Sequence, residues 1–191
     1  MDVVELSERW ASSYDCWIDA PGTEEPVYAC PYQSAANDTQ NAKESELTWP
    51  DATRNLLFPL FGFTASNPLG NEKSSFENEN ANKALKKDLQ LLSSSSEHVA
   101  WWNSFAFGPS WQEKGFIISA ERSEVARLAK KYNQGAIYEF ILDSKEDLSS
   151  SFAVAATALR KTIPVLIPDV EADIRIIRCQ RPPFASSDPK F

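Results

Sequence analysis

The sequence contains little of the chemistry on which common enzyme sites depend. Its 191 residues include one histidine, His98, six glycines and three cysteines. No Cys-x-x-Cys or Glu-x-x-His spacing occurs, so we expect no metal site. The glycines are isolated and form neither a GxGxxG nor a Walker pattern, which excludes nucleotide binding of those two kinds. We therefore expect no cofactor, and His98 is interpreted as a solvated loop residue rather than a catalytic one.

Long hydrophobic runs and an excess of positive charge are also missing. No stretch approaches the roughly 20 apolar residues that cross a bilayer, and the first residues, Met1 to Glu5, lack the basic and apolar regions of a secretion signal. The net charge of −8 disfavours nucleic acid as a partner. We expect a soluble intracellular protein, cytoplasmic by default, with an organelle interior as the alternative if a targeting segment was removed.

The three cysteines, Cys16, Cys30 and Cys179, are too few and too scattered for a disulfide framework. Reducing surroundings fit this count best, and whether Cys16 and Cys30 pair is left open. Hydrophobic residues make up 42% and charged residues 24% of the chain, values that allow one well-packed domain.

The chain divides by composition into three parts. Residues 1–55 mix aromatic residues with prolines and a polar run, which predicts an irregular aromatic N-terminal extension with at most a short helix from Val3 to Tyr14. Residues 56–180 carry the periodic segments and are expected to form an α+β domain. Residues 181–191 are expected to form a C-terminal tail.

Between residues 56 and 142 the patterns predict the order strand, helix, strand, strand, helix, strand. The expected elements are strand 56–65, helix 77–92, strands 99–107 and 115–120 joined as a hairpin, helix 123–132 and strand 136–142, followed by apolar stretches 152–159 and 174–179. This order predicts an α+β fold, a split βαβ-type sandwich in which two helices pack on one face of an antiparallel or mixed sheet and the last strand adds to an edge.

Several polar residues flank these elements and are candidate ligand-binding residues. Asn67 lies in the turn after the first strand, where it either contacts a ligand or satisfies backbone groups. Asn78 and Asn82 share one helix face. Trp111 and Glu113 share one side of a strand, where the carboxyl group is either a perturbed acid or a solvated rim residue. Gln134 either contacts a ligand or caps the preceding helix.

These residues also carry a resemblance to a known family. The segments Thr64-Ala65-Ser66-Asn67-Pro68, Asn78-x-x-x-Asn82-x-x-Leu85-x-x-x-Leu89, Trp111-x-Glu113 and Leu128-Ala129-x-x-Tyr132-x-Gln134-x-Ala136-Ile137 resemble, in their order, the family called domain of unknown function 3293. The resemblance covers about residues 58–142. It implies a fold-sized unit with shared polar positions and no particular reaction.

Two functions are compatible with these patterns. The first is a non-catalytic binding or assembly protein whose aromatic arm and tail engage a larger protein complex, because aromatic side chains often anchor interfaces. The alternative is a small enzyme or ligand-binding domain that recognises a small polar metabolite, neutral or zwitterionic rather than a polyphosphate. Because the first and third strands of the split βαβ order can be neighbours, we expect Asn67 and Glu113 to lie at one edge of the domain.

Overall fold

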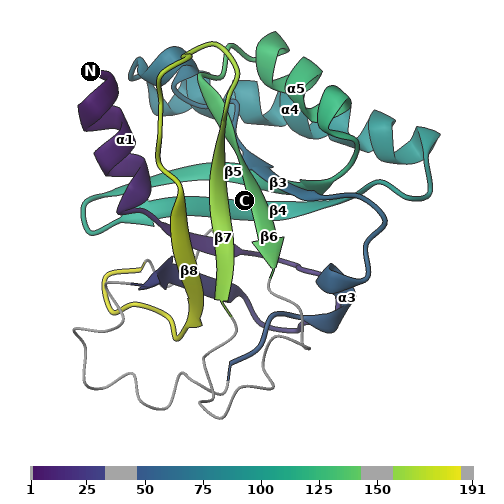
Figure 1. Ribbon diagram of the computed structural model, residues 1–191. Coiled ribbons are helices and arrows are strands. Elements are labelled where there is room, and N and C mark those ends of the chain that lie inside the picture. Colours follow the sequence, from purple (N-terminus) through teal and green to yellow (C-terminus); the bar gives the residue numbers. More distant parts are fainter. Residues whose placement is uncertain (1, 33–46, 143–156, 186–191) are drawn as a thin grey trace.

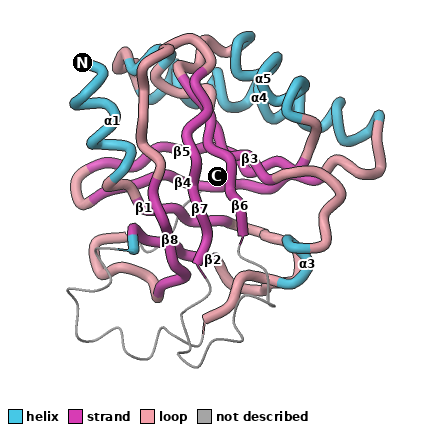
Figure 2. Tube along the Cα trace, viewed as in Figure 1, coloured by secondary structure: helices cyan, strands magenta, loops and turns pink. Residues whose placement is uncertain are grey.

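Eight antiparallel strands form a closed barrel in the computed structural model, which describes residues 2–32, 47–142 and 157–185 (Figure 1). The strand order around the barrel is β1-β2-β8-β7-β6-β3-β5-β4, and β4 pairs with β1 to close it. The strands are β1 (Tyr14–Trp17), β2 (Val27–Pro31), β3 (Leu60–Phe63), β4 (Ala100–Gly108), β5 (Trp111–Ser119), β6 (Ala136–Leu142), β7 (Thr157–Pro164) and β8 (Ile174–Cys179). Strands β4 and β5 run across β6, β7 and β8, so the two halves of the barrel cross (Figure 2).

This barrel shows that the expected α+β sandwich was wrong. The four strands of the expected unit do lie together as β6-β3-β5-β4, but the sheet does not end at their edges. Strands β7 and β8 continue it on one side, and β1 and β2 on the other, until the sheet closes. Closure depends on pairs such as Tyr14 with Phe107 and Pro31 with Ile176. Such distant pairs leave no local pattern in the sequence.

The N-terminal segment, expected to be irregular, supplies α1 (Val3–Ala11) and the strands β1 and β2. Helix α1 ends before Tyr14, because Ser12 and Ser13 donate hydroxyl hydrogen bonds to the carbonyl groups of Glu8 and Trp10. Residue Pro31 ends β2, a position where its missing N–H costs little. Residues 152–156 of the expected stretch 152–159 lie outside the described residues. Strand β7 begins directly after them, at Thr157.

Two helices cover one outer face of the barrel, α4 (Ser75–Ser95) and α5 (Arg122–Lys131) (Figure 1). Both helices were predicted, with small shifts at their ends. Helix α4 starts earlier than expected, because Ser74 and Glu77 form a reciprocal capping box. Its buried residues Leu85 and Leu89 pack on the barrel in a cluster with Phe61. The described residues also form the helical turns α3 (Asp51–Arg54) and the short 3-10 helix η2 (Pro68–Gly70).

One end of the barrel interior is filled by aromatic rings. The ring of Trp17 lies 5.0 Å from Trp49, 5.8 Å from Trp102 and 5.2 Å from Phe140, measured between centroids. Along β5, Ile117 packs in this cluster whereas Glu113 lies towards the other end. The barrel therefore has a closed aromatic end and an opposite end where polar groups gather.

Three further expectations concern single residues and the membrane. Cys16, Cys30 and Cys179 are all buried and form no disulfide, so Cys16 and Cys30 do not pair. The His98 side chain is 54% exposed in the connection between α4 and β4. Among the described helices, none is both long and apolar enough to cross a membrane.

Candidate functional site

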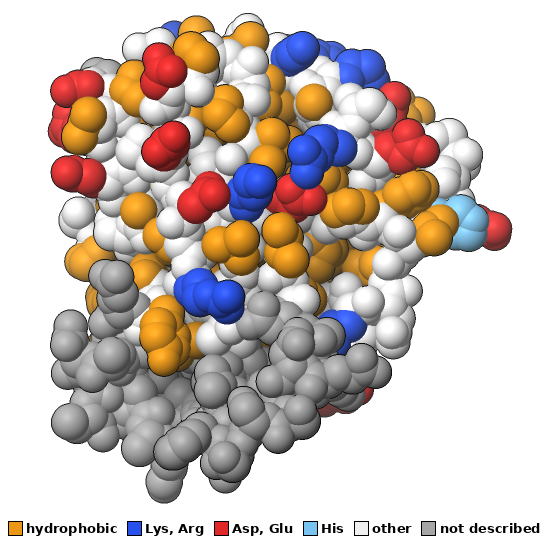
Figure 3. All heavy atoms as spheres, in the orientation of Figure 1, with side chains coloured by type: hydrophobic (Ala, Val, Ile, Leu, Met, Phe, Trp, Pro, Cys, Tyr) orange, Lys and Arg blue, Asp and Glu red, His pale blue; other side chains and the backbone are white. Residues whose placement is uncertain are grey.

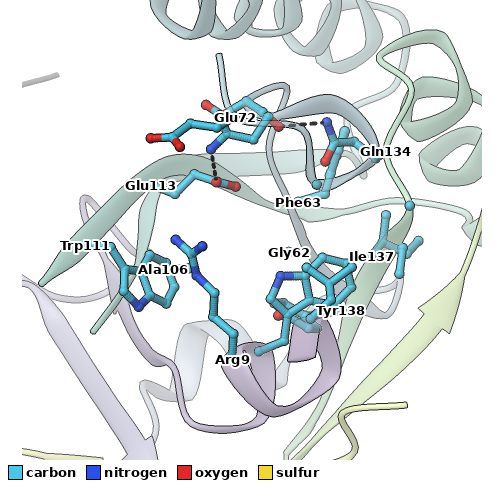
Figure 4. A pocket seen from close by; sticks show the side chains of 17 residues that line it. Arg9, Gly62, Phe63, Glu72, Ala106, Trp111, Glu113, Gln134, Ile137 and Tyr138 are labelled. Carbon is cyan, nitrogen blue, oxygen red and sulfur yellow. Dashed lines mark hydrogen bonds between the residues drawn. The ribbon is translucent and has the colours of Figure 1, made fainter. Parts of the chain in front are cut away.

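A pocket of about 190 Å³ lies at the barrel end opposite the tryptophan cluster (Figure 4). Its walls come from the ends of four strands, β3, β4, β5 and β6, and helix α1 lies over it. The strands contribute Gly62, Phe63, Ala106, Trp111, Glu113, Ala136, Ile137 and Tyr138, and the helix contributes Leu6, Arg9 and Trp10. We call this hollow the barrel-mouth pocket. Sites in the mouths of barrels are common places for small ligands.

Asn67 is the centre of the turn that forms one wall. Its backbone is left-handed, with φ of 46°, a conformation that Asn tolerates better than most residues. Its backbone N–H donates to Asn78 Oδ1 over 2.9 Å, and Asn78 Nδ2 donates back to Asn67 Oδ1 over 2.9 Å. The remaining donor, Asn67 Nδ2, reaches Glu113 Oε2 over 2.8 Å. The turn is thus held by α4 on one side and holds the Glu113 carboxyl group on the other.

Asn82 has a structural role one helical turn further along α4. Its Oδ1 accepts from the backbone N–H of Ala65 over 2.9 Å, and its Nδ2 donates to Ser66 Oγ over 2.8 Å. The same Nδ2 lies 3.3 Å from the Lys114 carbonyl oxygen, which ties the start of β5 to the turn. Asn82 is buried, and it does not line the barrel-mouth pocket.

Glu113 is one of two acidic groups that line the pocket, the other being Glu72. Burial raises the pKa of the Glu113 carboxyl group to about 7, while the hydrogen bond from Asn67 and the positive charge of Arg9 oppose that rise. A carboxyl group with this pKa is divided between its two protonation states at neutral pH, so it can accept or donate a proton there. Its second oxygen, Oε1, receives no hydrogen bond from any residue that the structure describes.

Arg9 faces Glu113 from α1. Its guanidinium carbon lies 4.7 Å from the centroid of the Trp111 ring, a cation-π arrangement that holds the charged group against a flat wall. Within the described residues, no carboxylate lies within 4.0 Å of its guanidinium nitrogens. Figure 4 shows the Arg9 side chain reaching into the space between Trp111 and Glu113. The pocket therefore contains one positive and one acidic group that do not form an ion pair.

Gln134 adds an uncharged polar group. It is buried, and its Nε2 donates to the carbonyl oxygens of Ser66 and Tyr132, over 3.1 Å and 3.2 Å. The bond to Tyr132 closes the end of α5, and the bond to Ser66 fixes the Asn67 turn. Its Oε1 receives no hydrogen bond in the described part of the chain.

A buried ion pair holds the helix that lies over the pocket. Arg160 Nη1 donates to Asp15 Oδ2 over 2.6 Å, and both side chains are almost fully buried. Arg160 also lies 4.7 Å from the Tyr138 ring centroid and donates through Nη2 to the carbonyl oxygen of Trp10 over 2.6 Å. That carbonyl belongs to the last turn of α1, where a positive charge is favourable. Arg160 thus fixes the helix that carries Arg9.

A second hollow, of about 390 Å³, lies on the outer side of the Asn67 turn. It shares Arg9, Asn67, Trp111 and Glu113 with the barrel-mouth pocket and adds Asn78 and Asn82. The hydrogen bond from Asn67 to Glu113 therefore lies between an inner and an outer hollow.

The structure brings four of the six expected residues, Asn67, Trp111, Glu113 and Gln134, to the barrel-mouth pocket. Asn78 and Asn82 hold the turn from the outer side. Sequence reasoning missed Arg9, Tyr138, Arg160 and Asp15. Arg160 sits at an inward position of β7 between Ala158 and Thr162, but the expected strand stopped at residue 159. Among described residues, no group of three or more His, Cys, Asp or Glu side chains could hold a metal ion.

The comparison with protein families confirms the resemblance predicted from the sequence. Residues 63–137 match the model of a family described as Protein of unknown function (DUF3293). The matched segment contains all six expected residues, whereas Arg9, Tyr138 and Arg160 lie outside it. Neither a curated protein nor a solved structure matches the chain.

Proposed function

We propose that this protein binds a small polar molecule, neutral or zwitterionic, in the barrel-mouth pocket. The observation that carries the proposal is Glu113, a carboxyl group held in place by Asn67 and directed into a hollow that also contains Arg9. Ligand pockets combine apolar walls with a few polar groups at fixed positions. Here the apolar walls are Phe63, Ile137 and the Trp111 ring.

The size and charge of the pocket limit the ligand. Its volume of about 190 Å³ is smaller than the roughly 300–1,000 Å³ of sites for drug-sized molecules. Two acidic side chains, Glu72 and Glu113, line it against the single arginine. A polyphosphate would be repelled by these carboxylates and would leave most of its charge unpaired. A small molecule with few charges fits this lining.

A thermal-shift screen of small metabolites tests the proposal. The wild type is compared with Asn67→Ala and Glu113→Gln, because one removes the support of the carboxyl group and the other removes its charge. A ligand present at a hundredfold excess over its dissociation constant stabilises the folded state by about 2.7 kcal/mol. We expect at least one compound to stabilise the wild type and to lose this effect in both variants.

Glu97→Gln is the matched control, since it removes a carboxylate that is 88% exposed between α4 and β4. It should respond to the same compound as the wild type does. If no compound stabilises the wild type, or if every stabilising compound acts equally on both pocket variants, the pocket is not a ligand site.

The other candidate function is assembly into a larger protein complex. The aromatic residues that motivated it pack within the protein: Trp17 and Trp49 lie in the barrel core, and Phe184 of the tail packs against Tyr14 and Phe107. The support that remains is a set of exposed hydrophobic side chains, Tyr32, Phe76 and Leu91. On the face shown in Figure 3, hydrophobic, acidic and basic side chains are interspersed. Light scattering after size exclusion, with pull-down from native extract, would detect such a partner.

We further propose that the protein acts inside the cell, in the cytoplasm by default, with an organelle interior as the alternative. The support is that none of the three cysteines forms a disulfide, and cysteines remain reduced most readily in a reducing compartment.

A further inference from the structure

Two opposite charges face the barrel-mouth pocket without neutralising each other. Glu113 engages Asn67 through Oε2 only, and Arg9 rests on the Trp111 ring rather than on a carboxylate. The Arg9 charge still attracts the Glu113 carboxylate without direct contact, and it therefore opposes the rise in the pKa of Glu113. Within the described residues no ion pair joins the two. A site of this kind is complementary to a molecule that carries both charges itself.

The positive end of the site is held in position by the fold. Arg9 lies in the last turn of α1, directly before Trp10, whose carbonyl oxygen is bonded by the buried Arg160. Stacking on Trp111 leaves the guanidinium edge free to donate. A planar guanidinium binds a carboxylate through two parallel hydrogen bonds.

The acidic end offers acceptors without hydrogen bonds. Glu113 Oε1 and Gln134 Oε1 accept no hydrogen bond from any described residue, and Gln134 is only 7% exposed. Neither oxygen is among the fully buried atoms without a partner, so both are accessible from the pocket, where a donor group on a ligand can bond them. An ammonium group has three donors and a charge opposite to that of Glu113.

We propose that the barrel-mouth pocket takes a small zwitterion of the amino-acid type, with its ammonium group against Glu113 and Gln134 and its carboxylate against Arg9. This inference rests on the proposed function of the same pocket. The ligand's side chain would lie against the apolar walls formed by Phe63, Ile137 and the Tyr138 ring. A neutral ligand would leave both protein charges unpaired, and a purely anionic one would meet Glu113 and Glu72.

Binding of the ammonium group has a consequence for pH. The charged groups that face Glu113 are Arg9 from α1 and Glu72 from the loop before α4, with Tyr138 on β6 and the Asp15 and Arg160 pair beyond its ring. Burial raises the pKa of Glu113 to about 7, so much of the carboxyl group is protonated at pH 6. An ammonium group favours the ionised form and displaces that proton. Affinity should therefore rise by up to about tenfold per pH unit below pH 7 and level off above it.

Isothermal titration calorimetry with the twenty standard L-amino acids tests the inference on the full chain. For the tightest binder, the amide, which keeps only the ammonium group, and the N-acetyl form, which keeps only the carboxylate, are then titrated. We expect the zwitterion to bind at least tenfold more tightly than either. Arg9→Met and Glu113→Gln should each weaken it at least tenfold, and Glu113→Gln should also abolish the dependence on pH between 5.5 and 7.

Matched controls are Arg127→Met and Glu97→Gln, which remove the same charges from side chains 59% and 88% exposed outside the pocket. Both should bind as the wild type does. Circular dichroism of each variant shows that the fold is kept.

The outcomes separate this inference from the proposed function. If a neutral compound from the metabolite screen binds in a Glu113-dependent manner and Arg9→Met leaves its affinity unchanged, the pocket is a ligand site and the zwitterion is overturned. The inference of a zwitterionic ligand is also overturned if the amide or the N-acetyl form binds as tightly as the amino acid. If no amino acid and no other compound binds in a Glu113-dependent manner, both proposals fall.

Discussion

Glu113 couples the stability of the folded protein to pH. Burial raises its pKa to about 7 in the folded state, against about 4.3 for an exposed glutamate in the unfolded chain. Between these values the folded state retains a proton that the unfolded state has lost. The stability that this group contributes is therefore complete below about pH 4.3 and is lost as the pH rises through 7.

Glu113→Gln removes this dependence while keeping an acceptor for Asn67 Nδ2. Relative to the wild type, we expect the variant to gain stability as the pH rises from 5 to 8, by on the order of 2 kcal/mol. Thermal unfolding across that range measures the gain, with Glu97→Gln as the exposed control. A difference between wild type and Glu113→Gln that stays constant with pH would show that the carboxyl group is not perturbed.

Asp15 and Arg160 form the most deeply buried ion pair in the described part of the chain, with side chains 6% and 0% exposed. Burial raises the pKa of Asp15, and the Arg160 charge and hydrogen bond hold that rise back. Removing one partner of a buried pair leaves an uncompensated charge and costs about 3–5 kcal/mol. We expect Arg160→Met and Asp15→Asn each to lower the free energy of unfolding by this amount.

The double variant should lose much less free energy of unfolding than the two single variants lose together. Each charged side chain is costly mainly when its partner has been removed. Urea denaturation of the wild type, both single variants and the double variant measures the coupling. Strictly additive losses would mean that the two side chains contribute independently. Arg160→Met should also loosen α1, since its bond to the Trp10 carbonyl is lost.

At the scale of elements, α4 is the support of the Asn67 turn. Its inward face carries Leu85 and Leu89, which pack on the barrel, and Asn82, which bonds the backbone of Ala65 and Lys114. A side chain that satisfies buried backbone groups is expensive to remove, because those groups have no water to replace it.

Asn82→Ala should therefore lower the free energy of unfolding by about 2–3 kcal/mol. Asn80→Ala is the matched control on the same helix, because Asn80 is exposed. Asn80→Ala should leave the free energy of unfolding unchanged or raise it by a few tenths of a kcal/mol, since alanine is the better helix former. Chemical denaturation of both variants measures the difference, and equal losses would contradict the role assigned to Asn82.

The elements that sequence patterns predicted well are those whose evidence is local. Helix α4 shows a regular apolar spacing, and the β4–β5 hairpin joins two apolar runs across a short turn. The meeting of Asn67 and Glu113 also followed from the sequence, because β3 and β5 are neighbours in the split βαβ order. Local order was sufficient for these features.

The missed elements depend on distant partners. Strand β1 has only four residues, and β2 is buried at all five positions, so neither alternates between polar and apolar residues. Arg9 looked like an ordinary residue on the surface of a short helix. Only the closed barrel brings it beside Trp111. The candidate site could therefore be predicted on the side formed by residues 63–137 but not on the side formed by α1.

At the scale of the whole molecule, closure joins the matched family segment to the rest of the chain. Residues 63–137 contain β4, which pairs with β1 along its second half, and β2 pairs in turn with β8. Without β1 and β2, the strands β4 and β8 would become sheet edges with unpaired backbone groups. The aromatic core would also lose Trp17, which contacts three other rings.

A chain that begins at residue 47 should therefore not unfold cooperatively. Loss of a large buried aromatic side chain alone costs about 3–5 kcal/mol, a large part of the stability of a typical domain. We expect this fragment to associate or to show a broad, shallow thermal transition by circular dichroism. Adding a peptide of residues 1–32 should restore a sharp transition, because it supplies both missing strands, Trp17 and Asp15. The same peptide with Trp17→Ala and Asp15→Asn should fail to do so. A fragment that folds cooperatively without the peptide would show that closure through β1 and β2 is dispensable.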